Sequence, residues 1–310
     1  MTVRPWLLAA LGALLVAAPA APLAAQNRRD GDPDEGAYQS RLDTTVALAR
    51  DGTVDLSLVS GEIIVSSWDR DQVKIEARTE RGILRFDASP SRVALSVRSD
   101  RGEMGDTRFR VTIPATARLV GRSVSGDISA RGAGSAELHS VSGDIVVSDV
   151  AGRATLESVS GGVRARRIGA GLRVSSVSGD LDLSGITGDV DAHTVSGEIG
   201  LEQVKSNFVR TETVSGDTHF SGPLDPQGRY EFHSHSGDVR LGIPPVGATF
   251  EIQTFSGDVQ SDYQMTLQPG SRQGRRNMQF TINGGGARVS AETFSGDVTI
   301  GRITGANRED

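Results

Sequence analysis

The sequence has 310 residues, of which 37% are hydrophobic but only 5% aromatic, and 38 are glycine. Glycine is far above its usual share of about 7%, so a bulky globular core is not expected. The net charge is −6 with no block of like charge, which argues against a basic surface for nucleic acid or an anionic membrane. Cysteine is absent, which excludes disulfides, thiol catalysis and cysteine-based metal sites.

The first 25 residues have the layout of a secretory signal peptide. Arg4 gives a positive start, residues 6–18 form an apolar run, and small residues lead up to Ala25 just before Gln26. We predict cleavage after Ala25 and export to the periplasm, the cell surface or the medium, with an uncleaved anchor as the alternative. No second long apolar run follows, so we expect no integral membrane segment after cleavage.

The rest of the chain divides by composition. Residues 26–41 are polar and charged, which predicts a flexible linker. Residues 42–122 contain longer strand-like runs, and we interpret them as a β-rich N-terminal capping portion, because the end of a repeat stack needs a protected edge. The regular repeat occupies residues 123–303, and we expect residues 304–310 to be a disordered tail.

A short motif recurs ten times in the chain. It consists of an apolar or histidine residue, then Ser-Gly, usually an acid, and an aliphatic residue. From Gly126 to Gly257 the motif glycines lie 17 to 21 residues apart, and the last follows after 39 residues. We interpret this last gap as two ordinary ones, with a loop from Pro269 to Asn277 that conceals a degenerate copy. The motif glycines are Gly61, Gly126, Gly143, Gly161, Gly179, Gly197, Gly216, Gly237, Gly257 and Gly296.

A finer period of nine residues divides each repeat into two halves. Glycines at positions 143, 152, 161, 179, 188 and 197 fall on this grid, and the segments between them are short, alternating and rich in β-branched residues. The pattern predicts an all-β, single-stranded β-solenoid of about ten coils of roughly 18 residues. Its hand stays open. Each coil adds one strand spacing of about 4.8 Å, so the coils would form a rod about 50 Å long.

The Ser-Gly-acid motif has two interpretations. In the first interpretation, Ser and Gly are the central residues of a type II turn, because glycine accepts the positive φ that the third position of this turn requires. Alternatively the motif continues a strand in which Val124, Gly126 and Ile128 point inward and the core leaves no room for a side chain. The predicted motif residues are Gly126, Asp127, Gly143, Asp144, Gly179, Asp180, Gly197, Glu198, Gly216, Asp217, Gly237, Asp238, Gly257, Asp258, Gly296 and Asp297.

The acids of the motif would form a column along one edge of the rod. Carboxylates stacked one strand spacing apart repel each other by about 1 kcal/mol per pair even in water, so hydrogen bonds or cations must offset the repulsion. The favoured interpretation is that each acid caps its own turn through a backbone N–H. A calcium-binding β-roll is the alternative, although such rolls use G-G-x-G-x-D in every turn, and Gly162 replaces the acid once here.

We find no constellation of residues that indicates catalysis or a cofactor. Histidines are few, His233 and His235 alternate in one strand, and no G-x-S-x-G elbow occurs. Arg164, Arg166 and Arg167 form a basic cluster opposite the coil that lost its acid. Aromatic residues gather after position 208, which indicates either a contact region or core filling. They are Phe220, Tyr230, Phe232, Phe250, Phe255, Tyr263, Phe280 and Phe294.

Taken as a set, the motifs resemble the putative-adhesin family of bacterial β-strand-repeat proteins, a domain of unknown function. The similarity is carried by the V-S-G-D-I coils, by V-T-I-P at Val111 to Pro114 and by the stretch from Ile282 to Val298. It covers roughly residues 42–303. The resemblance implies a β-helix-like body at the cell envelope, and it implies no catalytic residues.

These observations predict a non-enzymatic, exported structural, adhesion or binding module of the cell envelope. Its partner would be an envelope protein, a glycan or a surface, and we expect no nucleic acid, metal or cofactor. A carbohydrate-active enzyme on the same scaffold is the alternative from another functional class.

Overall fold

The computed structural model describes residues 40–98, 105–264, 266–267 and 277–303. The predicted signal peptide, residues 26–39 of the predicted linker, residues 269–276 of the predicted loop and the predicted tail lie outside them. The first strand, β1 (Ser40–Ala47), begins two residues inside the segment that we expected to be linker. All regular structure among the described residues is β-strand.

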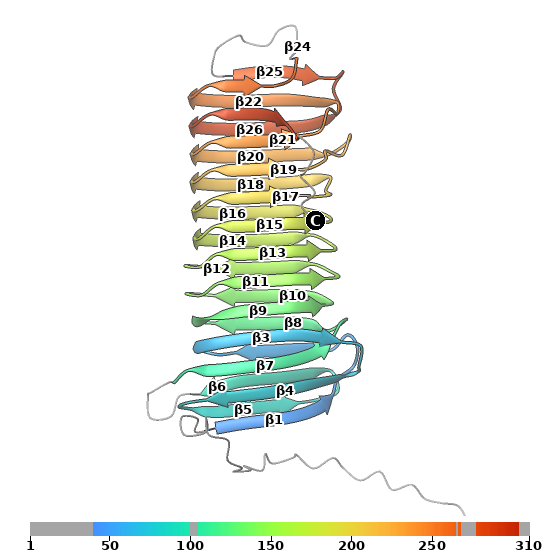
Figure 1. The fold of residues 1–310 in the computed structure, drawn as a ribbon, viewed down its shortest axis with the longest axis vertical. Coiled ribbons are helices and arrows are strands. Elements are labelled where there is room, and N and C mark those ends of the chain that lie inside the picture. The colour runs from blue at the N-terminus through green and yellow to red at the C-terminus, as the bar shows by residue number, and fades with distance from the viewer. Residues whose placement is uncertain (1–39, 99–104, 265, 268–276, 304–310) are drawn as a thin grey trace, which may run out of the picture. The chain divides into compact units, whose positions relative to one another are not determined.

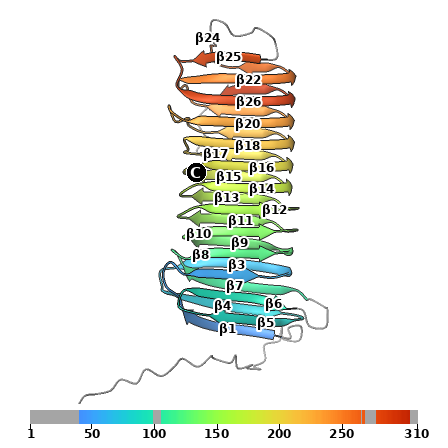
Figure 2. The same cartoon turned by 180° about the vertical axis from the view of Figure 1, so that it is seen from behind.

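The strands form two sheets, A and B, which face each other along the whole stack (Figure 1). Figure 2 shows the stack from behind. In stacking order, sheet A contains β1, β4 (Gln72–Thr79), β7 (Thr107–Pro114), β3 (Ser60–Trp68), β9 (Ser125–Ala133), β11 (Ile145–Val150), β13 (Val163–Ile168), β15 (Leu181–Ile186), β17 (Ile199–Glu202), β19 (Thr218–Ser221), β21 (Val239–Ile243), β27 (Val298–Arg302) and β23 (Val259–Ser261).

Sheet B has the same organisation and begins at the opposite end of the stack. In stacking order it contains β24 (Thr266–Leu267), β25 (Asn277–Ile282), β22 (Ala248–Ser256), β26 (Ala287–Ser295), β20 (Arg229–Ser236), β18 (Phe208–Ser215), β16 (Val190–Ser196), β14 (Leu172–Ser178), β12 (Ala154–Ser158), β10 (Ser135–Ser140), β8 (Arg118–Ser123), β2 (Thr53–Ser57), β6 (Arg92–Arg98) and β5 (Ile83–Ala88).

Each coil of the solenoid consists of one strand of sheet B followed by one strand of sheet A. Successive coils pair in parallel and in register, so that Leu156 lies beside Val174 in sheet B and Val147 beside Ala165 in sheet A. Side chains alternate between the space between the sheets and solvent, as strand geometry requires. The core is therefore a layer of aliphatic residues between the sheets, and the two-strand coil explains the nine-residue half-period of the sequence.

Chain order and stacking order differ at both ends. The coil β2–β3 lies between β6–β7 and β8–β9, and the coil β26–β27 lies between β20–β21 and β22–β23. Antiparallel strands complete the ends: β4 and β1 on β7, β5 on β6, and β25 and β24 on β22. The 39-residue gap before Gly296 therefore does not hold a degenerate coil in its described part, because β24 and β25 run antiparallel there.

Candidate binding surfaces

The motif glycines form one column at the corner where the chain passes from sheet B to sheet A. A Cβ atom added to any of them from Gly126 onward would lie 2.0–2.4 Å from the carbonyl oxygen of the motif glycine in the coil beneath. Real Cβ atoms do not come that close to backbone oxygen. Glycine is thus required because the backbones of adjacent coils touch at this corner.

Neither sequence interpretation of the motif describes this corner fully. Gly197, Gly216 and Gly237 have φ of 158°, 152° and 154°, whereas a type II turn requires about +80° at its third position. The type II assignment is therefore wrong. The strand interpretation places Gly126 and Ile128 inward correctly, but Val124 is 45% exposed and points outward.

A buried hydroxyl three residues before the glycine is a part of the corner that sequence reasoning missed. Ser or Thr occupies this position in successive coils, buried between the sheets. The Thr194 hydroxyl donates to the carbonyl of Gly179 at 3.3 Å, and that of Thr293 donates to Gly237 at 3.2 Å. Where the bond forms, the hydroxyl satisfies a glycine carbonyl of the neighbouring coil, whereas those of Ser123, Ser140, Ser158 and Thr213 have no partner among the described residues. The recurrence of Ser or Thr at a fixed distance from Gly is the signal that could have revealed this column.

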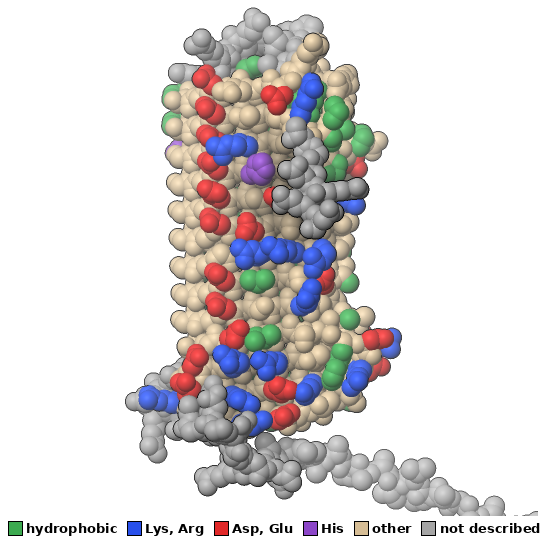
Figure 3. Space-filling model, viewed as in Figure 1, with side chains coloured by type: hydrophobic (Ala, Val, Ile, Leu, Met, Phe, Trp, Pro, Cys, Tyr) green, Lys and Arg blue, Asp and Glu red, His purple; other side chains and the backbone are tan. Residues whose placement is uncertain are grey.

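The motif acids form the predicted column, and Figure 3 shows their red side chains along one edge of the stack. Each bonded carboxylate accepts the backbone N–H at the acid position of the next coil, so Asp127 Oδ1 accepts from Asp144 and Asp144 Oδ1 accepts from Gly162, both at 2.9 Å. The prediction that each acid caps its own turn is wrong. The remaining bonds of the column, 2.8–2.9 Å long, join Asp180 to Glu198, Asp217 to Asp238, Asp238 to Asp297, and Asp297 to Asp258.

An exposed apolar ridge runs beside the motif corner on the outer side of sheet B. From the coil of Gly126 onward, the side chain two residues before the motif glycine is 44–53% exposed wherever it is Val or Phe. At the C-terminal end the side chains are aromatic and stack face to face, with ring centroids 5.0 Å apart for His235 and Phe294 and 4.7 Å for Phe255 and Phe294. In stacking order the ridge consists of Val124, Val141, Val159, Val177, Val195, Val214, His235, Phe294 and Phe255.

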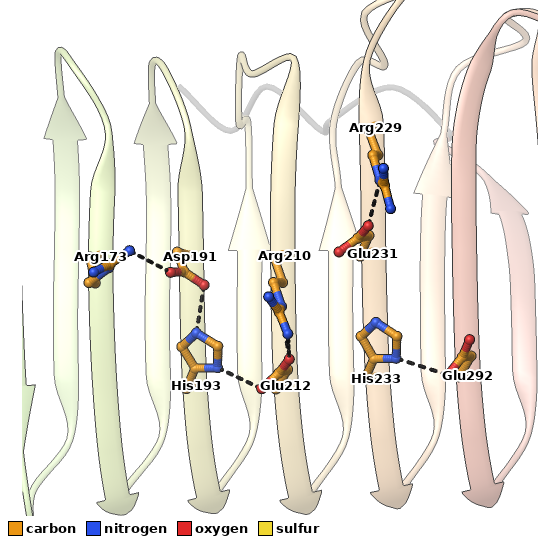
Figure 4. Close-up of polar contacts among 9 residues, drawn as sticks. All are labelled: Arg173, Asp191, His193, Arg210, Glu212, Arg229, Glu231, His233 and Glu292. Atoms are coloured by element: carbon orange, nitrogen blue, oxygen red, sulfur yellow. Dashed lines mark hydrogen bonds and ion pairs between the residues drawn. The ribbon is translucent and has the colours of Figure 1, made fainter.

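Charged side chains cover the outer face of sheet B next to the ridge. His193 lies between two acids, with Nε2 2.5 Å from Asp191 and Nδ1 3.1 Å from Glu212 (Figure 4). Arg173 extends the chain of contacts to Asp191 at 3.1 Å, and Arg210 pairs with Glu212. Burial raises the pKa of Glu212, but Arg210 and His193 outweigh it and hold that pKa below its ordinary value.

Two further histidines of this face contact acids in the same way. His233 Nδ1 lies 3.2 Å from Glu292 on the next strand (Figure 4), and His139 Nδ1 lies 3.0 Å from Glu157. Sequence reasoning missed these pairs, because the partners lie 18 or 59 residues apart and meet only through the parallel register. These contacts join side chains of neighbouring strands across the outer face of sheet B.

A shallow groove of about 520 Å³ crosses the C-terminal part of this face. Arg229, Glu231, His233 and Glu292 line it, and Arg229 pairs with Glu231 at 2.5 Å. A second hollow of about 400 Å³ lies between this groove and the aromatic end of the ridge. Of the aromatic residues after position 208, only Phe255 and Phe294 are exposed and reach this surface. The others are buried core residues: Phe220, Tyr230, Phe232, Phe250, Tyr263 and Phe280.

The basic cluster predicted from sequence lies on the outer face of sheet A. Arg167 makes two contacts with Asp149, at 2.6 and 2.9 Å, and Arg131 reaches the same carboxylate at 3.3 Å. Arg167 is the main reason that the pKa of Asp149 falls to about 2. Both Asp149 and Arg167 have positive φ, 61° and 54°, and the ion pair stabilises this unusual backbone. Arg164 contacts Asp182 at 3.1 and 3.2 Å.

The described residues contain no group of three His, Asp or Glu side chains arranged to hold a metal ion. Within the same ranges there is also no helix with the length and apolar character needed to cross a membrane.

Comparison with known proteins identifies the fold family. The sequence profile described as Toastrack DUF4097 matches residues 69–301, more than half of the chain, and confirms the family resemblance inferred from the motifs. A putative cell adhesion protein from Clostridium sporogenes is 8% identical, with a TM-score of 0.20 over 85% of this chain and 100% of that one. A putative adhesin from Bacteroides fragilis is 14% identical, with a TM-score of 0.41 over 86% and 99%. No curated protein matches the chain.

Proposed function

The chain belongs to the Toastrack DUF4097 family, and we propose that it is an exported, non-catalytic β-solenoid that serves as a binding or adhesion module of the cell envelope. In this proposal about ten coils form the rigid body, an N-terminal cap closes it, and the signal peptide directs export. The partner is an envelope protein, a glycan or a surface.

The exposed apolar ridge is the observation that supports the proposal. Val159, Val177 and Val195 are 44–46% exposed on three successive coils, and similar side chains continue the line in both directions. A contiguous apolar surface of this kind marks an interaction site in soluble proteins. Strand register holds each side chain one strand spacing, about 4.8 Å, from the next, so the ridge is a regular and rigid line of contact.

The charged surfaces favour binding over catalysis. In the groove of sheet B, Arg229 pairs with Glu231 and His233 with Glu292. A hydrolase needs an acid and a base that are free to meet a substrate. The acid column would also repel the phosphates of a nucleic acid, which supports the proposal that nucleic acid is not the partner.

The ridge can be tested by binding of the purified mature chain, residues 26–310, to envelope fractions of the producing bacterium. The variant carries Val159→Thr, Val177→Thr and Val195→Thr, which keep the β-branched shape but replace three exposed methyl groups by hydroxyls. We expect association to weaken at least about tenfold, since each lost apolar group contributes about 0.8 kcal/mol.

Val146→Thr is the matched control, because Val146 is an exposed valine (37%) on the outer face of the other sheet. Its association should equal that of the unmodified chain. The ridge proposal is wrong if the triple variant binds as well as the unmodified chain, and the binding function itself is wrong if the unmodified chain does not associate with envelopes.

A further inference from the structure

One coil of the acid column has no carboxylate, because Gly162 stands at the acid position. Size does not impose this glycine. A Cβ atom at Gly162 would lie 3.7 Å from its nearest neighbours, Asp144 Oδ1 and the carbonyl oxygen of Asp180, which is ordinary contact. The adjacent motif glycine, Gly161, would instead place a Cβ 2.3 Å from backbone oxygen. The gap at Gly162 therefore has room for a carboxyl group.

The gap leaves a backbone donor without its usual acceptor. In the complete coils the carboxylate accepts the amide of the acid position in the next coil, as Asp127 does for Asp144. The amide above Gly162 belongs to Asp180, and no described residue accepts its hydrogen. The coil below is complete, since Asp144 Oδ1 binds the amide of Gly162. A single acceptor is missing between Gly162 and Asp180.

Arginine side chains lie directly beside the gap. Arg164 and Arg166 follow Gly162 at alternate positions along β13 and are exposed on the outer face of sheet A. Figure 3 shows a row of Lys and Arg side chains at mid-height of this face. Arg164 contacts Asp182 on the next coil, while Arg166 has no acidic partner among the described residues. Two guanidinium groups therefore lie beside the break in the acid column, which Asp144 and Asp180 flank.

The same chain contains a complete version of this arrangement. Arg240 follows Asp238 by two residues, as Arg164 follows Gly162. Its guanidinium binds two carboxylates of the column, Asp217 Oδ2 at 2.7 Å and Asp238 Oδ2 at 2.8 Å. At β13 the arginine is present but the carboxylate of its own coil is not. The geometry around Arg240 shows what a carboxylate placed at Gly162 would bind.

A second break in the column serves as a comparison. Glu198 replaces Asp in the coil of β17, and it does not accept the amide of Asp217. The residue two positions later is Gly200, so no arginine stands beside this break. Among the described coils, the combination of an unfilled acid position, an unpaired amide and a neighbouring arginine occurs at Gly162.

We propose that the gap at Gly162 binds a carboxylate of an extended acidic segment of a protein partner. The group missing from the gap is one aspartate side chain. In an extended segment, alternate residues lie about 6.6 Å apart, and Gly162, Arg164 and Arg166 have this same spacing along β13. Asp144 and Asp180 flank the gap, so the segment lies along β13 and not along the column. This site rests on the proposed binding function and gives its partner a chemistry.

The site can be tested with a fluorescent peptide in which Asp alternates with Ser, titrated with the mature chain, residues 26–310, at low salt. Gly162→Asp supplies the missing carboxylate from the chain itself, and we expect it to weaken peptide binding at least about tenfold. Gly200→Asp is the matched control. It adds the same charge to the same face two coils away, with similar room for its Cβ (3.8 Å), and should change binding less than about twofold.

The NMR signal of the Asp180 amide distinguishes binding at the gap from general charge attraction, which would not change it. The signal should shift downfield and saturate as the peptide is added, and it should not respond in Gly162→Asp. Circular dichroism of each variant verifies the fold. The site is wrong if Gly162→Asp binds like the unmodified chain, or if Gly200→Asp weakens binding equally. A chain that binds oligogalacturonate but not the peptide would overturn the protein partner in favour of an acidic polysaccharide.

Failure of this site and failure of the proposed function are distinguishable in the envelope assay. If the unmodified chain associates with envelopes but does not bind the acidic peptide, the site is wrong and the function stands. If the unmodified chain binds the peptide but not envelopes, the function is wrong. The ridge variant, with its changes on the other sheet, should bind the peptide normally.

Discussion

In the middle of the stack, from β10–β11 to β18–β19, every coil lies on the coil that precedes it in the chain. At the C-terminal end the last coil, β26–β27, instead lies between two earlier coils. The acid column continues into this end, since Asp238 binds the amide of Asp297 and Asp297 that of Asp258. Coils therefore stack by matching corners, and succession in the chain is not required.

The two regions also fill their cores differently. The middle uses aliphatic side chains such as Leu156 and Val174, whereas Phe220, Tyr230 and Phe232 pack edge to face near the C-terminal end, with centroids 5.6–5.8 Å apart. Large rings fit there because small residues surround them; Thr211 and Ala291 are the strand neighbours of Phe232. Aromatic rings that pack edge to face therefore fill the core near this end, where chain order and stacking order differ.

The largest expected effect compares these cores. Phe232→Ala should lower the free energy of unfolding by about 3–5 kcal/mol, because the ring is buried and the cavity cannot close between stacked strands. Val174→Ala, its counterpart in the middle, should cost about 2 kcal/mol. Urea denaturation measures both. Equal losses would contradict the idea that the aromatic core secures the C-terminal end.

Replacement of a motif glycine should lower the free energy of unfolding equally in both regions. Gly161→Ala in the middle and Gly296→Ala at the end place a Cβ 2.3 and 2.2 Å from backbone oxygen, and each should cost about 3 kcal/mol. Gly162→Ala, one residue along, has open space and should change stability by less than about 0.5 kcal/mol. The comparison of melting curves for Gly161→Ala and Gly162→Ala separates close backbone contact from a general effect of losing glycine.

Hydrogen exchange tests the insertion of the last coil. Strand β26 has hydrogen-bonded neighbours on both sides, β20 and β22, while β5 is paired on one side only, with β6. Amides of β26 should therefore exchange at least about 100-fold more slowly than those of β5, and as slowly as those of β16 in the middle. Fast exchange throughout β26 and β27 would mean that the last coil is not inserted.

A smaller effect, the dependence of stability on the ionisation of Asp149, is expected in the middle of the stack. The folded pKa of Asp149, about 2, lies below its ordinary value of 3.8 because of Arg167. The resulting stability is present above pH 3.8 and is lost as the pH falls through about 2. Since the Asp149 side chain is 37% exposed, we expect less than about 1 kcal/mol. Asp149→Asn should flatten the stability curve between those pH values, and an unchanged acid dependence would show that the pair contributes nothing.

Removal of divalent cations should have the smallest effect. Carboxylates of the column are bonded to backbone amides, so their repulsion is offset within the protein in the middle and at the end alike. Thermal melting followed by circular dichroism with and without a chelator should therefore agree within about 1 °C. A larger fall in Tm would support the calcium-binding alternative.

Sequence periodicity predicted much of the fold, because coils that stack in register carry equivalent residues at regular intervals along the chain. The spacing of motif glycines and the nine-residue half-period led to two strands per coil and to an acid column on one edge. The outward direction of the Val124 side chain was missed. Alternation along a strand predicts that Val124 points inward like Gly126, but the alternation is interrupted where the chain turns from sheet B to sheet A. The role of the glycines was also misassigned, because the atoms they avoid belong to another coil.

The binding surfaces were harder to predict. The pairs His193–Glu212 and His233–Glu292 join residues 19 and 59 positions apart, and only the parallel register reveals them. The absent acid at Gly162 was visible in the sequence, but its meaning depends on the unpaired amide of Asp180 and on the geometry of Arg240. Such contacts arise between coils, and no local pattern encodes them.

The sequence by itself determined that the chain is a repetitive all-β stack with a glycine, and usually an acid, at one corner of each coil, because the coils carry similar local signals. Only the tertiary structure decided which coil follows which at the ends. Corners of all coils are alike, so local pattern allows several orders, and the antiparallel strands β1, β4, β5, β24 and β25 together with the shapes of the end cores select one.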